Sequence, residues 1–147
     1  MRWLGIARRA QDIAVARAAD RQLFGSGLAE LGMVQQMIAD SEIDIAATRG
    51  LILRACWELD QGHSAGQSTA IAKTFSAEAI WRVVDRAVQI CGSLGISGDL
   101  PLGRFLREVR PFRIYDGPSE VHRWAVARRV MRRHLNSLRG NVEETDP

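Results

Sequence analysis

Residues 67–91, QSTAIAKTFSAEAIWRVVDRAVQIC, decide the fold of this chain. The segment contains neither glycine nor proline, and its apolar residues recur three or four positions apart, as on one face of an α-helix. This apolar stripe consists of Ile71, Phe75, Ile80, Val83, Val84, Ala87 and Val88. A helix of this length with one apolar face must bury that face against other elements, so the segment predicts a helical domain.

The segments on either side follow the same pattern. We expect a first helix over residues 1–23, ended by Gly25-Ser-Gly27, and a second over about 29–59, ended by the turn at 61–66. A short helix is expected at about 101–109 and a last helix from Pro118, because proline suits a first helical turn. No stretch alternates apolar and polar residues as a strand does.

Long helices joined by short turns pack as antiparallel neighbours. The sequence therefore predicts an all-α fold, an up-down four-helix bundle with a short additional helix. The bundle is expected to occupy residues 1–137, and residues 138–147 are expected to form a polar, frayed tail.

Composition narrows the class of protein. With 147 residues, 46% hydrophobic and 25% charged, the chain is expected to be a single globular domain. No apolar run reaches the roughly 20 residues of a membrane span, and Arg8 and Arg9 interrupt any signal-peptide core. Cys56 and Cys91 cannot form a disulfide framework, and no His/Cys spacing suggests a metal site. We expect a location in the bacterial cytoplasm or the mitochondrial matrix.

The net charge of +3 comes mostly from arginine, which suits bidentate contact with carboxylates and phosphates. The cluster Arg128, Arg129, Arg132 and Arg133 raises the possibility of a nucleic-acid surface. No aromatic residues interleave with it as base stacking requires, so we interpret it as a solvated helix face and expect no nucleic-acid partner.

The stretch Arg113–Arg123, RIYDGPSEVHR, holds the principal candidate for chemistry. Asp116 is a lone carboxylate just before a Gly-Pro break and a predicted helix start. It is interpreted either as a cap of that helix, made by Asp116 or Gly117, or as a general base beside Tyr115.

Two further positions have both a structural and a functional interpretation. Arg21, at a helix end and followed by Phe24, is either a surface residue or an anchor for a phosphate. The glycine-rich segment that begins at Gly92 follows a helix, so a C-terminal cap with chain reversal is expected there, with Gln89 at the surface. The three histidines, His63, His122 and His134, are interpreted as structural or solvated.

Together these motifs make the chain resemble the C-terminal helical domain of the acyl-CoA dehydrogenases. The resemblance rests on 21–25 (RQLFG), 89–95 (QICGSLG) and 115–118 (YDGP), with 57–62, 71–75, 87–90 and 106–110 between them. It spans roughly residues 1–135. It implies a flavoprotein fold and the oxidation of acyl-CoA thioesters to 2-enoyl-CoA with FAD.

The resemblance also implies roles for individual residues. Arg21 and Phe24 would contact the FAD of a neighbouring subunit, and Gln89, Gly92 and Ser93 would hold its adenosine side. Asp116 would remove the substrate α-proton in place of the family's usual Glu, with its backbone N–H polarising the thioester carbonyl and with Tyr115 and Gly117 next to the substrate.

Some positions depart from the commonest family pattern, because Asp116, Pro118, Ser93 and Glu120 replace more frequent residues. The shorter base requires a substrate or a backbone placed differently, and Pro118 removes a hydroxyl that often contacts the flavin. The family's N-terminal helical domain and middle β domain have no counterpart here, so we expect an isolated chain of this extent to bind FAD weakly and to be a poor catalyst.

The partners that the resemblance implies are an acyl-CoA substrate, an electron-transfer flavoprotein and further copies of the chain in a homo-oligomer. The alternative function is a non-catalytic helical module of the same ancestry, which would serve oligomerisation or assembly.

Overall fold

A computed structural model describes residues 1–143 of the chain. Its long helices are α1 (Arg2–Asp20), α2 (Gly32–Asp60), α3 (Gly66–Cys91) and α6 (Ser119–Glu143), and its shorter ones are α4 (Ser93–Ile96) and α5 (Leu102–Val109). Two 3₁₀ helices, η1 (Leu28–Glu30) and η2 (Arg110–Arg113), and two short strands, β1 (Gln22–Leu23) and β2 (Ser26–Gly27), complete it. The predicted all-α fold is confirmed.

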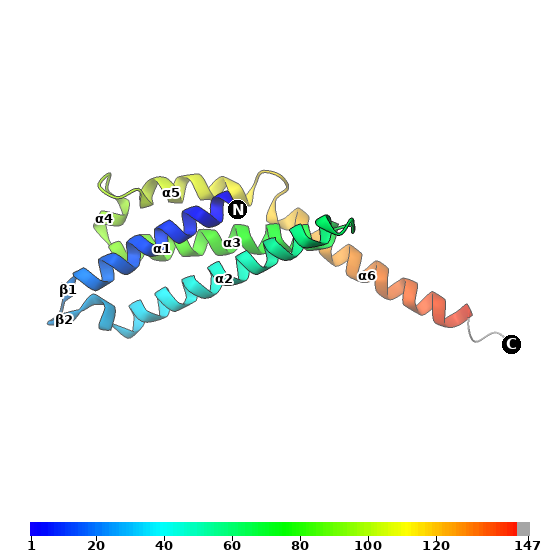
Figure 1. Cartoon of the computed structure of the whole chain (residues 1–147), viewed down its shortest axis with the longest axis horizontal. Coiled ribbons are helices and arrows are strands. Elements are labelled where there is room, and N and C mark those ends of the chain that lie inside the picture. The colour runs from blue at the N-terminus through cyan, green and yellow to red at the C-terminus, as the bar shows by residue number, and fades with distance from the viewer. Residues whose placement is uncertain (144–147) are drawn as a thin grey trace.

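Helix α3 is the centre of the molecule and contacts α1, α2, α5 and α6 (Figure 1). The apolar stripe of α3 is buried at Ile80, Val83, Val84 and Ala87, as predicted. This stripe packs against a row of alanines on α1. Ala7, Ala10, Ala14 and Ala18 are at most 1% exposed. Because alanine side chains are small, they allow close approach of the two helices.

The expectation that the described chain lacks strands is wrong at one point. Strands β1 and β2 pair antiparallel, Gln22 with Gly27 and Leu23 with Ser26. The two residues between them, Phe24 at φ +53° and Gly25 at φ +82°, both have left-handed backbone, as in the tight turns that connect paired strands. Pairs of two residues are too short to produce an alternating pattern in the sequence.

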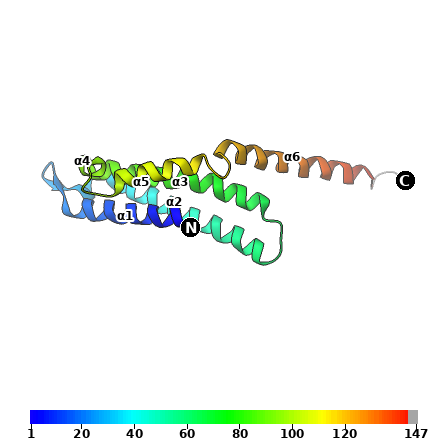
Figure 2. The same cartoon turned by 90° about the horizontal axis from the view of Figure 1, so that it is seen from above.

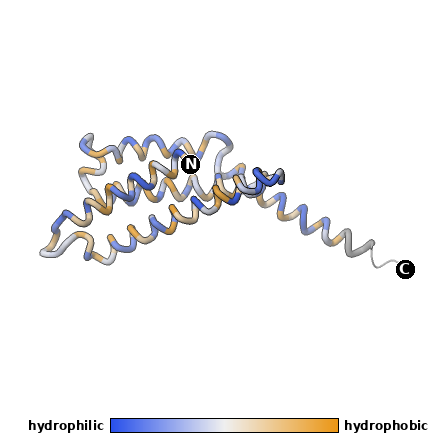
Figure 3. The backbone as a smooth tube through the Cα atoms, in the orientation of Figure 1, coloured by the Kyte–Doolittle hydropathy of each residue, from blue (hydrophilic) through white to orange (hydrophobic). Residues whose placement is uncertain are grey.

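The last helix lies differently from the expected fourth member of a bundle. Helix α5 lies beside α1 and α3, whereas α6 packs along α3 and then projects beyond it (Figures 1 and 2). The projecting part is mostly hydrophilic (Figure 3). Helix α6 also continues to Glu143, past the predicted end of the last helix, and residues 144–147 of the expected tail lie outside the described residues.

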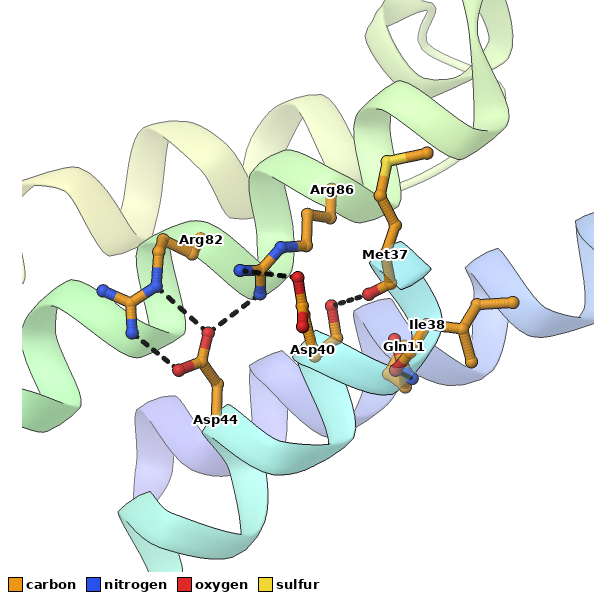
Figure 4. Close-up of polar contacts among 8 residues, drawn as sticks. Gln11, Met37, Ile38, Asp40, Asp44, Arg82 and Arg86 are labelled. Atoms are coloured by element: carbon orange, nitrogen blue, oxygen red, sulfur yellow. Dashed lines mark hydrogen bonds and ion pairs between the residues drawn. The ribbon is translucent and has the colours of Figure 1, made fainter. Parts of the chain in front are cut away.

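A charged network joins α2 to α3 within this packing (Figure 4). Asp44 is 7% exposed, and its carboxylate accepts hydrogen bonds from Arg82 Nη2 at 2.6 Å and Arg86 Nη1 at 2.8 Å. On the neighbouring face, Gln11 Nε2 donates to the backbone oxygen of Ile38 at 2.9 Å and joins α1 to α2. These polar contacts fix how the three helices are aligned along their lengths.

No helix in the described part of the chain has both the length and the apolar character needed to cross a membrane.

Candidate functional site

The segment between η2 and α6 carries Asp116 in a strained turn. Ile114 N–H and Tyr115 N–H both donate to the carbonyl of Pro111, at 2.8 and 3.0 Å. Asp116 has φ +53° and Gly117 has φ +92°, so two successive left-handed residues reverse the chain before Pro118. Among the non-glycine residues that the structure describes, only Phe24 and Asp116 have positive φ, and both are predicted site residues. Backbone strain of this kind concentrates at functional sites.

The structure does not support the interpretation of Asp116 as the cap of the last helix. The first backbone bond of α6 runs from His122 N–H to the carbonyl of Pro118 at 3.2 Å, so Pro118 takes the capping position. The Asp116 carboxylate is exposed and makes no hydrogen bond with the described residues, while its backbone oxygen lies 3.0 Å from His122 Nε2. His122 therefore has the structural role that the sequence predicted.

Three aromatic rings form a wall beside the Asp116 segment. The Phe112 ring lies 5.9 Å from that of Trp3 and 5.8 Å from that of Tyr115, measured between centroids. Behind them is an apolar cleft of about 250 Å³ between α1, α2 and α3, lined by Trp3, Phe112 and Lys73 among others. Partial burial raises the pKa of Tyr115 above its usual value, since burial disfavours the phenolate.

A carboxylate on α3 fastens both sides of the Asp116 segment. Glu78 Oε2 lies 2.9 Å from Arg113 on η2, and Glu78 Oε1 lies 3.9 Å from Arg123 on α6. Burial alone would raise the pKa of Glu78, but hydrogen bonding and the charges of these two arginines outweigh it and lower that pKa. The segment from 114 to 122 is therefore bracketed by ion pairs to one residue.

The other predicted site residues lie at the far end of the bundle. Arg21 directly follows α1 in an extended conformation, with no carboxylate partner among the described residues, and Phe24 is 91% exposed at the hairpin tip. Because α1 and α3 run in the same direction, this hairpin and the α3–α4 junction lie at one end of the molecule (Figure 1).

The α3–α4 junction confirms the predicted cap and reversal at Gly92. The N–H of Gly92 contacts the carbonyls of Val88 and Gln89 at 3.0 and 3.2 Å, and its φ of +61° with ψ of −134° suits only glycine. Gln89, Gly92 and Ser93 are all exposed there. The sequence did not predict that a short helix, α4, begins at Ser93.

The structure thus brings the eight predicted residues into two groups. Arg21, Phe24, Gln89, Gly92 and Ser93 share the end formed by the hairpin and α4, whereas Tyr115, Asp116 and Gly117 lie beyond the other end of α5. Sequence reasoning missed Lys73, Glu78 and Phe112 as supports of the second group. A signal was available for Lys73, because it is the only lysine in the chain.

Gly117 provides a stability test of this turn. We expect Gly117→Ala to destabilise the fold by about 1 kcal/mol more than Gly62→Ala does, because a Cβ at 117 would lie 2.6 Å from His122 Nε2 and would displace the ring from Asp116. Gly62 is the matched control, with φ +74° and open space around it. Chemical denaturation of both variants measures the difference, and equal losses would contradict the role of His122.

Comparison with known proteins agrees with the family resemblance of the sequence motifs. Residues 1–131 match the family described as "Acyl-CoA dehydrogenase, C-terminal domain". The chain is 40% identical over 144 residues to "Probable acyl-CoA dehydrogenase FadE2" of Mycobacterium tuberculosis, covering 97% of this chain and 35% of that protein.

Solved structures agree with the sequence match. Butyryl-CoA dehydrogenase from Megasphaera elsdenii superposes with a TM-score of 0.84 at 31% identity, over 88% of this chain and 34% of that one. The FAD complex of PigA superposes with a TM-score of 0.85 at 27% identity, over 89% and 34% of the two chains. The chain spans about a third of the length of these relatives.

Proposed function

This chain belongs to the acyl-CoA dehydrogenase family, where it corresponds to the C-terminal domain, and from that membership we propose that it serves an FAD-dependent α,β-dehydrogenation of an acyl-CoA thioester with Asp116 as the base. The observation that carries the proposal is the exposed Asp116 carboxylate, which has no hydrogen-bond or ion-pair partner among the described residues and lies in a strained turn beside an aromatic wall. The described residues also fit the cofactor, because Arg21 is unpaired and Phe24 projects from the hairpin at one end of the bundle.

Asp116 would remove the α-proton, and the electron pair of that C–H bond would form the new double bond as a hydride leaves the β-carbon. Bound FAD supplies the acceptor for that hydride. The backbone N–H of Asp116 donates to no backbone carbonyl among the described residues, so it is available to polarise the thioester carbonyl. Tyr115 and Phe112 would exclude water from one side of the carboxylate.

Arg21 and Phe24 would hold the flavin, with the guanidinium on the pyrophosphate, and Gln89, Gly92 and Ser93 would lie near the adenosine. Because the two groups of residues lie at opposite ends of α5, we propose that the β1–β2 hairpin of each subunit contacts the flavin bound by a neighbouring subunit. Electrons would then pass to an electron-transfer flavoprotein, in the bacterial cytoplasm or the mitochondrial matrix.

The second candidate function is a non-catalytic assembly module. It is favoured by the exposed apolar residues of α6, among them Val121, Trp124, Met131 and Leu135, each at least 50% exposed. Surfaces of this kind usually mark contacts with other chains.

The visible absorption spectrum of the purified full-length protein separates the two candidates. A bound flavin that bleaches when an acyl-CoA is added supports the dehydrogenase. A colourless protein that takes up no added FAD supports the assembly module.

Arg21→Met tests the flavin contact directly. Loss of a charge-assisted contact with pyrophosphate is expected to weaken FAD binding roughly 10- to 100-fold. Arg8→Met changes another exposed arginine, in the first half of α1, and is expected to leave the affinity for FAD unchanged. Titration of the apoprotein with FAD measures both, and equal affinities for the two variants would remove Arg21 from the flavin site.

A further inference from the structure

Lys73 reaches from α3 to the segment that carries Asp116. Its ammonium lies 2.6 Å from the backbone oxygen of Phe112, to which it donates a hydrogen bond. The same ammonium lies 4.3 Å from the Phe112 ring centroid and 5.8 Å from that of Tyr115. A single cation thus contacts Phe112, which belongs to the aromatic wall, and Tyr115, the residue directly before Asp116.

We propose that Lys73 is a positioning residue that holds the Phe112–Tyr115 stretch, and through it the Asp116 carboxylate, in place. This inference rests on the proposed function of Asp116 as the base. Lys73 does not contact reacting atoms itself, because its ammonium is already engaged by the Phe112 oxygen and the two rings.

Composition supports a specific role for this side chain. Of the 20 Lys and Arg residues in the chain, 19 are arginine and Lys73 alone is lysine. A lysine ammonium is a compact charge on a flexible stem, and here it lies close to one carbonyl oxygen and two aromatic rings.

The surroundings of Lys73 show why such a contact matters locally. Among the described residues, the backbone between η2 and α6 is held by the Ile114 and Tyr115 N–H groups, which donate to Pro111, and by the contact of His122 with the Asp116 oxygen. Glu78 forms ion pairs with Arg113 and Arg123 on either side of this segment. Lys73 is the residue of α3 whose charged group lies beside the Tyr115 ring itself, 5.8 Å from its centroid. Asp116 and Glu78 are the carboxylates that face the Lys73 ammonium. Burial lowers the pKa of Lys73, although the charges of these two carboxylates act to raise it.

The test uses the full-length protein with Lys73→Met, which keeps the stem and removes the charge and the donors. We expect hydrogen exchange of peptides covering 112–118 to rise about 10-fold, since the lost contact is one charged hydrogen bond. With acyl-CoA as substrate, kcat is expected to fall roughly 10- to 100-fold with KM within about twofold, because a displaced base misses the α-carbon.

Two further variants make the result specific. Lys73→Arg keeps a cation with donors and is expected to recover part of both losses. Arg128→Met removes an exposed cation that lies 4.5 Å from the Trp124 ring, and it is expected to change neither exchange at 112–118 nor kcat.

Unchanged exchange at 112–118 in Lys73→Met would overturn the inference. So would a rise spread equally over peptides of α1 and α2, because that pattern belongs to general destabilisation. The exchange readout does not depend on chemistry, and Asp116→Asn tests the base separately. If Asp116→Asn keeps full activity the proposed function fails, whereas the exchange result still decides whether Lys73 holds the segment.

Discussion

Replacing Asp116 by Asn is expected to lower kcat of the full-length enzyme by about 10²- to 10⁴-fold, because an amide cannot accept the α-proton. Asparagine matches aspartate in size and tolerates the left-handed φ of +53°, so the turn should be preserved. The measurement is the rate of flavin bleaching with acyl-CoA, alongside the FAD affinity and the midpoint of thermal unfolding, which should both stay unchanged.

The matched control for this variant is Asp12→Asn, at an exposed aspartate on α1 that forms no ion pair with the described residues. It makes the same chemical change and is expected to retain full activity. Full activity in Asp116→Asn would assign the base to another group and would remove the main support of the proposed function.

Asp44→Ala is expected to cause the largest loss of stability, about 2–3 kcal/mol, because it leaves Arg82 and Arg86 without their buried partner. The expected value lies below that of a fully buried pair, since the Arg82 side chain is 43% exposed. Urea denaturation at pH 7 measures it. Asp40→Ala is the control, because Asp40 is 43% exposed and lies 3.9 Å from Arg86, so its loss should stay below about 1 kcal/mol.

The same pair of variants has an expected pH dependence. Burial raises the pKa of Asp44, but hydrogen bonds and charges from Arg82 and Arg86 outweigh burial and hold that pKa below its ordinary value of 3.8. A carboxyl with a lowered folded-state pKa contributes stability above its unfolded pKa and loses it as the pH falls through the folded value. The difference between the parent protein and Asp44→Ala should therefore be full at pH 7 and should shrink below about pH 4. A difference that stays constant down to pH 2 would contradict the ionised network.

The long helices could be predicted from sequence because their apolar residues repeat at helical spacing over many turns, and Ile80, Val83 and Val84 are buried as that spacing requires. The hairpin at Phe24 could not, because two paired residues have no periodicity. An apolar stripe also does not show which element it packs against. The stripe of α6 gives no indication that this helix lies on α3 and projects beyond it, and the sequence gives no indication that α5 lies beside α1.

The site divides in the same way. Positions with unusual local sequence, such as Asp116 before Gly-Pro and Gly92 after a helix, could be selected from the chain alone. Their supports could not, because Lys73 meets Phe112 across 39 positions and Asp44 meets Arg82 across 38. Such pairs are produced by the packing of helices and have no local pattern.

The length of α5 has a consequence for which insertions and deletions the chain can tolerate. This helix, Leu102–Val109, leads from the α4 end of the bundle to η2 and the Asp116 turn. One residue added to an α-helix advances it by about 1.5 Å and rotates everything beyond by about 100°. A single-residue insertion in α5 would therefore turn Phe112 away from Lys73, whereas a change near one whole turn would restore its direction. Length variants that keep the Asp116 turn in register should thus differ in α5 by three or four residues.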